Sequence, residues 1–252
     1  IAIDGNQIRN GKALLYKAIE LDQKAHLIAD EFRDSFRLTE VLAKHEFRFE
    51  EARQTLANLR SRPAEHDDLS QRSWLELNLG TLALAEEMPN VAVEHAERGT
   101  LWAKRFGDFT ALRELRALQA EALQSMGMTK DANQLFQGLA ADEPSPCRRA
   151  ELLMKQGRIQ RLAVESGQAL DGELLLQPLN EALRIFETPR DNGCDQRRLR
   201  LRVLLEMAYA QLVLRHYSDM QTLLGQLSQE LSRDAEQGIN KELELQWTYL
   251  RG

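Results

Sequence analysis

Apolar residues recur at spacings of three and four along most of this chain, which places them on one face of a helix. The clearest stretch runs from Trp74 to Phe106, where two such segments are separated by a short break at Met88-Pro89-Asn90. The same arrangement returns about 40 residues later, between Ala120 and Leu139. No segment shows the alternation that is typical of a half-buried strand. The pattern therefore predicts an all-α protein made of helical hairpins.

Breaks of a few residues divide the rest of the chain into similar pairs of antiparallel helices. The first helix is expected from Gly11 to Asp34, with no partner helix before it. We expect a single domain of five hairpins at 33–64, 73–106, 113–146, 148–190 and 196–234, with unpaired end helices at 9–32 and 235–252. One hairpin buries a single apolar face, so each hairpin should depend on the next for its stability.

Both end helices carry an apolar face that the sequence leaves without a neighbouring helix. In the last of them this face contains Leu243, Leu245, Trp247 and Leu250. Terminal units of stacked hairpins normally present a polar outer face. We therefore expect the chain to be a piece of a larger protein, with ordinary capping helices as the alternative.

Small residues take equivalent places in successive hairpins. Ala52, Ala92 and Ala132 are spaced by 40 residues, each on the second helix of its hairpin. A side chain larger than alanine would push two closely crossing backbones apart. We therefore expect these three alanines to be buried against neighbouring helices.

The hairpin at 113–146 carries a recognisable motif. Ala120 lies midway along its first helix, Ala132 and Phe136 are four residues apart on its second, and Pro144 follows. This arrangement resembles the tetratricopeptide (TPR) repeat. The hairpin at 73–106 shares the Leu79-Gly80 pair of that motif but lacks its aromatic residue and its proline. Repeats of about 40 residues are similar to those in the sensor region of MalT-like bacterial transcription regulators.

The resemblance implies a right-handed superhelix, an α-solenoid, in which the first helices line a concave groove where partners dock. Two of the residues that it places there, Trp74 and Tyr209, are candidate anchors because aromatic side chains concentrate binding energy. Burial in the core is an equally good reading of both. The groove residues that the resemblance implies are Arg37, Lys44, Trp74, Asn78, Thr81, Glu114, Glu121, Arg202 and Tyr209.

The most basic stretch of the chain begins the hairpin at 196–234. Arg198 and Arg202 fall on one helix face at a spacing of four, and Arg197 and Arg200 on another at a spacing of three. Arginine offers a planar fork of donors to a carboxylate, a phosphate or an acidic peptide. The alternative, which we favour, is a solvated face paired with nearby glutamates.

The charge balance and the composition limit the classes of partner. The net charge is -6 over 252 residues, which disfavours direct nucleic-acid binding by this region. No apolar run approaches the roughly 20 residues that span a bilayer, so no membrane partner is expected. The opening residues lack a charged-then-apolar signal segment. We therefore expect a cytoplasmic protein in which Cys147 and Cys194 are free thiols.

Sequence motifs for catalysis or cofactor binding are missing. His45-Glu46 lacks the second histidine of a zincin helix, and the other histidines have no ligand at metal-binding spacing. There is no Gly-rich phosphate loop and no nucleophile elbow. We therefore expect no enzyme activity, no metal and no cofactor.

These observations favour a non-catalytic scaffold that binds a protein or peptide, or senses an effector, as part of a bacterial signalling or transcription regulatory protein. In this hypothesis the partner, or a small-molecule effector, occupies the groove and shifts the superhelix between conformations. The main alternative is a constitutive assembly adaptor or chaperone-like TPR protein. An enzyme with a site between hairpins is the least favoured hypothesis.

Overall fold

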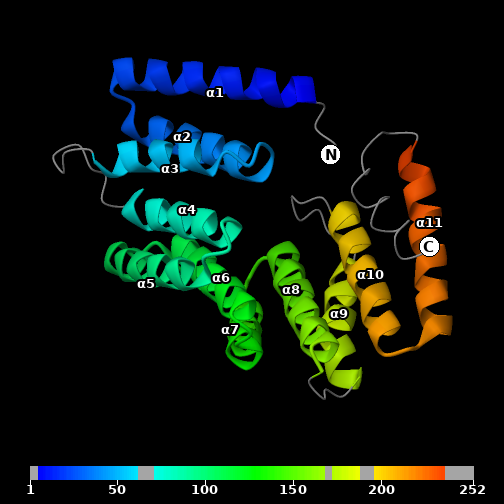
Figure 1. Cartoon of the computed structure of the whole chain (residues 1–252). Coiled ribbons are helices and arrows are strands. Elements are labelled where there is room, and N and C mark those ends of the chain that lie inside the picture. The colour runs from blue at the N-terminus through cyan, green and yellow to red at the C-terminus, as the bar shows by residue number, and fades with distance from the viewer. Residues whose placement is uncertain (1–4, 62–70, 168–171, 188–195, 236–252) are drawn as a thin grey trace. The chain divides into compact units, whose positions relative to one another are not determined.

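The computed structural model describes residues 5–61, 71–167, 172–187 and 196–235, and every regular element in those ranges is an α-helix. The expected all-α fold is confirmed. In chain order (Figure 1) the helices are α1 (Gly5–Ala25), α2 (Ile28–Lys44), α3 (Phe49–Arg60), α4 (Gln71–Ala85), α5 (Pro89–Phe106), α6 (Phe109–Ser125), α7 (Thr129–Ala141), α8 (Pro146–Glu165), α9 (Gly172–Glu187), α10 (Gln196–Val213) and α11 (Tyr217–Ala235). The expected end helix at 235–252 lies outside the described residues beyond Ala235.

The chain divides into two compact units. The N-terminal unit, Ile3–Met128, contains α1 to α6, and the C-terminal unit contains Thr129–Gly252 with α7 to α11. The division falls between α6 and α7, inside the hairpin expected at 113–146. The single domain expected from the sequence therefore stays a prediction, and each unit is described by itself.

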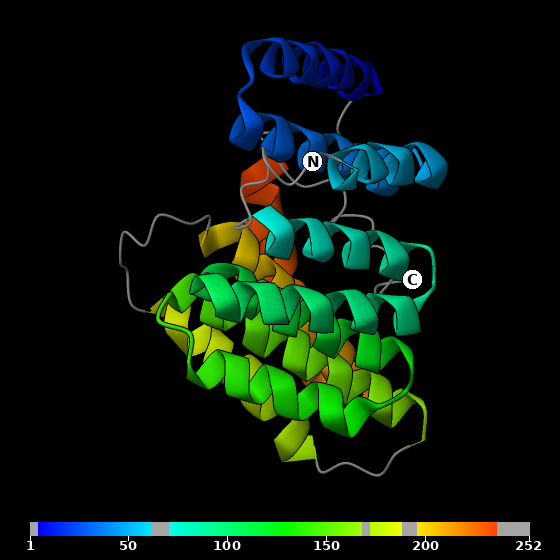
Figure 2. The same ribbon diagram turned by 90° about the vertical axis from the view of Figure 1, so that its left-hand side faces the viewer.

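Helices pack mainly against their neighbours in the sequence. Figure 2 shows this in the N-terminal unit, in layers from the dark blue α1 through α2 and α3 to α4 and α5. Within that unit the first helices of successive hairpins also contact each other, α2 with α4 and α4 with α6. In the C-terminal unit the first helices α8 and α10 do the same. Contacts limited to nearest neighbours of the stack are typical of helical-repeat proteins.

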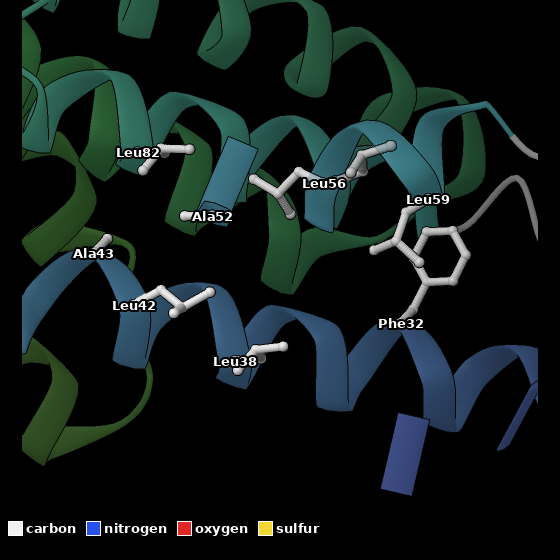
Figure 3. Close-up of a cluster of buried hydrophobic side chains, with 9 residues drawn as sticks. Phe32, Leu38, Leu42, Ala43, Ala52, Leu56, Leu59 and Leu82 are labelled. Carbon is white, nitrogen blue, oxygen red and sulfur yellow. The ribbon is translucent and has the colours of Figure 1, made fainter. Parts of the chain in front are cut away.

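The core of the N-terminal unit joins the first hairpin to the second. In Figure 3, Phe32, Leu38 and Leu42 of α2 face Leu56 of α3, with Leu82 of α4 beside them. All five are at most 2% exposed. Burying such a side chain contributes about 1.5–3 kcal/mol, so this cluster holds α4 onto the preceding hairpin as well as closing it.

Small residues stand where helices approach closely, as the repeat pattern predicts. Ala52, Ala92 and Ala132 are each 0% exposed. At Gly80, a Cβ atom would lie 2.6 Å from Cδ2 of Leu118 and 3.3 Å from the carbonyl oxygen of Ala92. The glycine of the TPR-like Leu-Gly pair is therefore needed for α4 to pack against both α5 and α6.

The breaks between helices share one backbone geometry. A residue in the left-handed region follows the helix at Phe47, Glu87, Gly127 and Gly167, positions that are 40 residues apart. After Glu87 the amide of Met88 donates to the carbonyl of Ala83 at 2.8 Å, which is the Schellman closure of a helix C-terminus. The 40-residue repeat therefore appears in the turns as well as in the small buried residues.

The first helix ends earlier than the sequence pattern suggests. We expected one helix from Gly11 to Asp34, but the chain turns at His26 and Leu27, so that α2 already begins at Ile28. His26 has a φ of 56°, and the amide of Leu27 donates to the carbonyl of Asp22 at 2.9 Å. This is again a Schellman closure, formed here without the glycine that usually marks it.

The expectation of a free thiol at Cys147 is wrong. Cys147 lies at the start of α8, is 7% exposed and is disulfide-bonded. The sequence contains one other cysteine, Cys194, which lies outside the described residues.

Candidate functional site

The N-terminal unit contains a groove of about 650 Å³ along its first helices. We call it the α2–α4–α6 groove, because α2 and α4 supply most of its lining and α6 contributes Glu114. Phe36 on α2 and Trp74 and Leu77 on α4 provide its largest apolar lining. A concave site of this size, apolar with a few polar groups, is typical of ligand and peptide binding.

The structure brings together six of the nine groove residues expected from the sequence. The residues that line the α2–α4–α6 groove are Arg37, Lys44, Trp74, Asn78, Thr81 and Glu114. Glu121 lies seven residues beyond Glu114 on α6, about two helical turns, and does not line it. Arg202 and Tyr209 belong to α10 in the C-terminal unit. Whether these residues bind a partner stays a prediction.

Trp74 is held in place by a residue from another helix. Its indole Nε1 donates to Oδ2 of Asp108 at 2.9 Å, while Oδ1 of the same carboxylate accepts from the backbone amide of Ala111 at 2.9 Å and so caps α6. The ring is partly buried against a small cluster that includes Ala103 and Leu115. Trp74 is therefore partly a core residue and partly a wall of the groove, which combines the two readings left open by the sequence.

The polar residues of the groove use many of their donors locally. Asn78 lines the groove and donates from Nδ2 to the carbonyl of Trp74 at 2.8 Å. Thr81 donates to the carbonyl of Leu77 at 2.8 Å. Both bonds link a residue to the one four positions earlier in α4. They fix the two side chains on the groove face of the helix.

The charged residues of the groove are paired along α2. Lys44 lies 2.7 Å from Glu40, and Arg33 lies 2.6 Å from Asp30. Arg37 makes a looser contact with Asp34, at 3.7 Å, and its side chain is 64% exposed. Exposed pairs of this kind contribute little to stability. The guanidinium of Arg37 is therefore the groove cation that a partner could recruit most easily.

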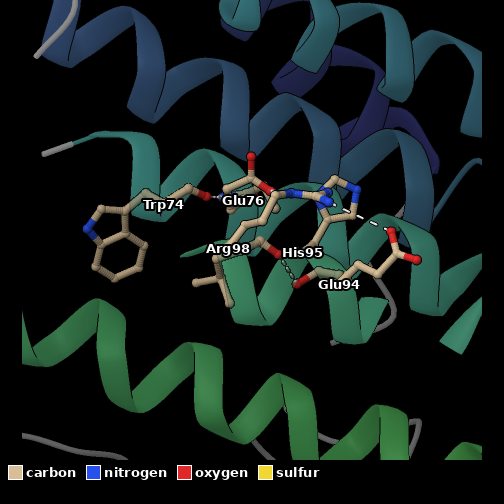
Figure 4. A network of polar contacts seen from close by, with 8 residues as sticks. Trp74, Glu76, Glu94, His95 and Arg98 are labelled. Atoms are coloured by element: carbon tan, nitrogen blue, oxygen red, sulfur yellow. Dashed lines mark hydrogen bonds and ion pairs between the residues drawn. The ribbon is translucent and has the colours of Figure 1, made fainter. Parts of the chain in front are cut away.

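A buried polar network lies on the other side of α4 from the groove lining (Figure 4). Oε2 of Glu76 lies 2.7 Å from Nδ1 of His95 and 3.2 Å from Nε of Arg98, both on α5. Burial raises the pKa of Glu76, but the hydrogen bond and charge of His95 and the charge of Arg98 outweigh it, and the net pKa is lowered. The network ties α4 to α5 and fixes the rotation of α4 about its axis.

In the C-terminal unit, the first helices α8 and α10 form a second charged face. Arg161 is 9% exposed, lies 3.4 Å from Oε2 of Glu206 and stacks over the ring of Tyr209 at 5.1 Å. This is a cation–π contact combined with an ion pair. Tyr209 is therefore engaged within the unit, whereas Arg202 is exposed on the same helix.

The basic stretch of α10 does not form one surface. Arg200 pairs with the carboxylate of Glu230 on α11, and Arg197 donates to the backbone carbonyl of the same residue at 3.2 Å. These two arginines therefore contact α11, and Arg200 alone of the two pairs with a glutamate side chain among the described contacts. Arg198 and Arg202, at a spacing of four, fall on a different face.

Several residues of the groove were missed by sequence reasoning. Arg33, Phe36 and Gln71 line it but were not selected. Arg33 and Phe36 share the helical spacing of Arg37 and Lys44, so extending that face by one turn would have found them. No spacing in the sequence predicts the pairing of Glu76 with His95, because that pairing depends on how α4 and α5 align.

The described residues also bear on metal sites and on membrane-spanning helices. No three His, Cys, Asp or Glu side chains gather there in a way that could hold a metal ion. None of the helices in the ranges that the structure describes has the length and apolar character needed to cross a bilayer.

No protein-family model and no curated protein sequence matches the chain. The structure is similar to a crystal structure of the nearly identical TPR-like repeats of a putative kinesin light chain from Podosopora anserina, with a TM-score of 0.58 and 18% identity over 80% of this chain and 95% of that one. A variant of the same protein gives a TM-score of 0.60 and 17% identity, over 81% and 96% of the two chains. The chain therefore has a TPR-like helical-repeat fold, and these identities bear on the fold alone.

Proposed function

We propose that the chain is a non-catalytic interaction scaffold that binds a protein or peptide partner in the α2–α4–α6 groove. The observation that carries the proposal is the convergence of the first helices of three hairpins on one cavity. Apolar side chains line it, and Arg37 and Glu114 add opposite charges to the lining. A partner would bury apolar groups against Phe36 and Trp74 and find polar groups for orientation at Asn78.

The pre-formed geometry of the groove supports this use. Trp74 is oriented by Asp108, and α4 is fixed from behind by Glu76, His95 and Arg98. A binding surface that is already ordered loses less conformational entropy when the partner arrives. Aromatic side chains held in this way are the usual centres of binding energy in interfaces.

The wider role follows the hypothesis drawn from the repeat pattern. The chain acts as the sensing or partner-binding region of a bacterial signalling or transcription regulatory protein, without contacting nucleic acid or membrane itself. A constitutive adaptor is the second candidate. Small-angle scattering separates the two: a sensor changes its radius of gyration when the partner binds, and an adaptor keeps it unchanged.

Site-specific photo-crosslinking tests the groove. A photoreactive phenylalanine analogue replaces Thr81, which is exposed inside the groove, and as a matched control Asn58, which is exposed on α3 and does not line it. We expect a partner adduct from position 81 only, and identification of that partner by mass spectrometry. Its affinity should then fall in the double variant Arg37→Glu, Lys44→Glu. Equal adducts from both positions, or an affinity that the double variant leaves unchanged, would contradict the proposal.

A further inference from the structure

The first helices of the C-terminal unit, α8 and α10, carry an excess of positive charge. Together they contain nine lysine and arginine residues and three glutamates, in a chain whose net charge is -6. The two helices contact each other and run in the same direction (Figure 1). The cations are Arg148, Arg149, Lys155, Arg158, Arg161, Arg197, Arg198, Arg200 and Arg202, and the acids are Glu151, Glu165 and Glu206.

Three of these cations are held by the neighbouring second helices. Arg149 pairs with Glu181 on α9, and Arg200 pairs with Glu230 on α11. Arg197 donates to the backbone carbonyl of Glu230 at 3.2 Å. Packing within the unit therefore accounts for these three arginines, and six cations remain.

The contacts of Glu206 bring one face of α10 beside one face of α8. Its carboxylate lies 4.0 Å from Nε of Arg158 and 3.4 Å from Nε of Arg161. About one turn earlier on the two helices are Lys155 and Arg202. Because α8 and α10 run in the same direction, Lys155 and Arg202 start from the same level of adjacent helices. We call the surface formed by Lys155, Arg158 and Arg202 the α8–α10 basic face.

The acids of the two helices do not balance this face. Glu151 pairs with Arg148 at 2.7 Å, and Glu165 pairs with Arg161. The third acid, Glu206, is shared between two arginines.

Two arginines of the basic face keep donors for a ligand. The side chain of Arg158 is 59% exposed, and its contact with Glu206 is a long one at 4.0 Å. Arg202 is exposed and forms no ion pair with any residue that the structure describes. The pairing with glutamates that the sequence favours therefore holds for Arg149 and Arg200 but leaves Arg158 and Arg202 unexplained.

Helix stability does not explain the charge pattern either. The N-terminal end of a helix carries a partial positive charge, which favours acidic residues there. The first turns of α8 and α10 contain no acid. Like charges at a spacing of four also repel each other, as Arg198 and Arg202 do. The first turns instead carry Arg148 and Arg149 on α8, and Arg197 and Arg198 on α10.

The size of the basic face limits the kind of anion that it fits. The guanidinium fork of arginine matches the oxygens of a phosphate. A single exposed charge pair contributes little, so the ligand has to contact both helices, whose axes lie about 8–10 Å apart when packed. A long nucleic acid would extend beyond α8 and α10 onto a chain that is acidic overall. These conditions favour a compact ligand with a high density of negative charge.

We propose that the α8–α10 basic face binds a small ligand that carries two or more linked phosphate groups. Arg158 and Arg202 bind its oxygens from the two helices, and Lys155 adds a third positive charge. The site belongs to the C-terminal unit and does not depend on the α2–α4–α6 groove, which belongs to the other unit.

Isothermal titration calorimetry of the full chain with inorganic tripolyphosphate at low ionic strength tests the site, because salt screens exposed charges. The double variant Arg158→Gln, Arg202→Gln should bind it about tenfold more weakly or worse. The matched control is Arg197→Gln, Arg200→Gln, which removes the same charge from residues that contact α11. The control should bind as the unaltered chain does. Circular dichroism checks that both variants keep their helices.

Comparison of ligands tests the class of anion. At equal ionic strength, inorganic orthophosphate should bind about tenfold more weakly than tripolyphosphate or worse, because one phosphate group does not reach both helices. ATP should compete with tripolyphosphate, since it carries the same linked phosphates. The groove variant Arg37→Glu, Lys44→Glu should bind tripolyphosphate normally, so the result does not depend on the groove.

Three outcomes would overturn the proposal: no binding of tripolyphosphate, an equal loss of affinity in the matched control, or orthophosphate binding as tight as that of tripolyphosphate. A single-stranded RNA or an acidic peptide that binds more tightly than tripolyphosphate, and is lost in the double variant, would overturn the assignment of the ligand.

Discussion

The indole Nε1 of Trp74 donates a hydrogen bond to Oδ2 of Asp108 at 2.9 Å, joining residues 34 positions apart. The other oxygen of that carboxylate caps α6 through the amide of Ala111. One side chain therefore starts the first helix of one hairpin and orients the aromatic residue on the first helix of the hairpin before it. The wall of the α2–α4–α6 groove and the stacking of its hairpins depend on the same contact.

Asp108→Ala should remove both hydrogen bonds, the one that caps α6 and the one to the indole of Trp74. Asp108→Asn should keep the cap, because its amide oxygen can still accept from Ala111. It should lose the bond to the indole, because its amide nitrogen is a donor and would face the indole N–H, which is also a donor. We expect the alanine variant to lose about 1–2 kcal/mol of unfolding free energy, and the asparagine variant less. Urea titration measures these losses. In both variants the indole N–H resonance of Trp74 should exchange faster with solvent, and an unchanged resonance in Asp108→Ala would contradict the assignment.

Glu76→Gln should change how stability depends on pH. The pKa of Glu76 is lowered from 4.5 in the folded chain, so the unfolded state binds more protons as the pH falls below that value. The stabilisation by this carboxylate is therefore complete above about pH 4.5 and is lost as the pH falls through the lowered value. At pH 7 we expect the variant to be roughly 1–3 kcal/mol less stable than the unaltered chain, with the gap narrowing in acid.

Denaturant unfolding from pH 7 down to pH 3 measures the difference in unfolding free energy between Glu76→Gln and the unaltered chain. Glu97→Gln serves as the matched control, because Glu97 is an exposed carboxylate on the same helix, α5, as His95 and Arg98. The plot of unfolding free energy against pH for Glu97→Gln should run parallel to that of the unaltered chain over the whole range. A Glu76→Gln curve that also runs parallel would mean that the network contributes no proton-linked stability.

Two glycines of the C-terminal unit should respond in opposite directions to alanine. At Gly157 a Cβ would lie 2.6 Å from both Cγ and Cδ2 of Leu179, whereas at Gly138 it would meet nothing within 4 Å. Gly157→Ala should therefore destabilise the unit by about 1–3 kcal/mol through overpacking. Gly138→Ala, in an exposed part of α7, should stabilise it by about 0.5–1 kcal/mol.

Thermal unfolding followed by circular dichroism compares the two glycine variants directly. Because both carry the same substitution within helices of one unit, general effects of replacing glycine cancel. A neutral or stabilising Gly157→Ala would contradict the close approach of α8 to α9.

The disulfide of Cys147 predicts a redox-dependent stability. Under non-reducing conditions Cys147→Ala should lower the unfolding free energy by about 2–4 kcal/mol. In the presence of a reductant the unaltered chain should fall to the same level as the variant. Equal stability of the unaltered chain with and without reductant would contradict the bond.

Thiol trapping in the cells of origin then addresses the compartment. Disulfides persist mainly in oxidising environments. A trapped, alkylated Cys147 would favour the cytoplasm expected from the sequence. An intact disulfide would favour a secretory or periplasmic location.

The helices and their breaks were predictable because their signals are local. Apolar spacing predicted a hairpin at 73–106, and these bounds lie within two residues of the start of α4 and the end of α5. The end of α1 was missed for the same physical reason, because His26 adopts the left-handed conformation without being glycine. Local composition gave no warning there.

Part of the groove was predictable because helical repeats convert sequence position into surface position. Residues such as Arg37, Asn78 and Thr81 lie on the face of a first helix, and first helices line the same side of a stack. The basic run of α10 shows the limit of this reasoning. Spacing alone could not tell which of its arginines would face Glu230 on α11.

The sequence by itself therefore determined the helical hairpins, their 40-residue period and the small residues that let them stack, since each depends on neighbours within a few turns of helix. Only the tertiary structure decided which side chains meet across helices: Trp74 with Asp108, Glu76 with His95, and Gln160 with Asn133. Those contacts depend on the rotation and axial offset of one helix against the next. Many side chains settle that offset together, and no single stretch of sequence encodes it.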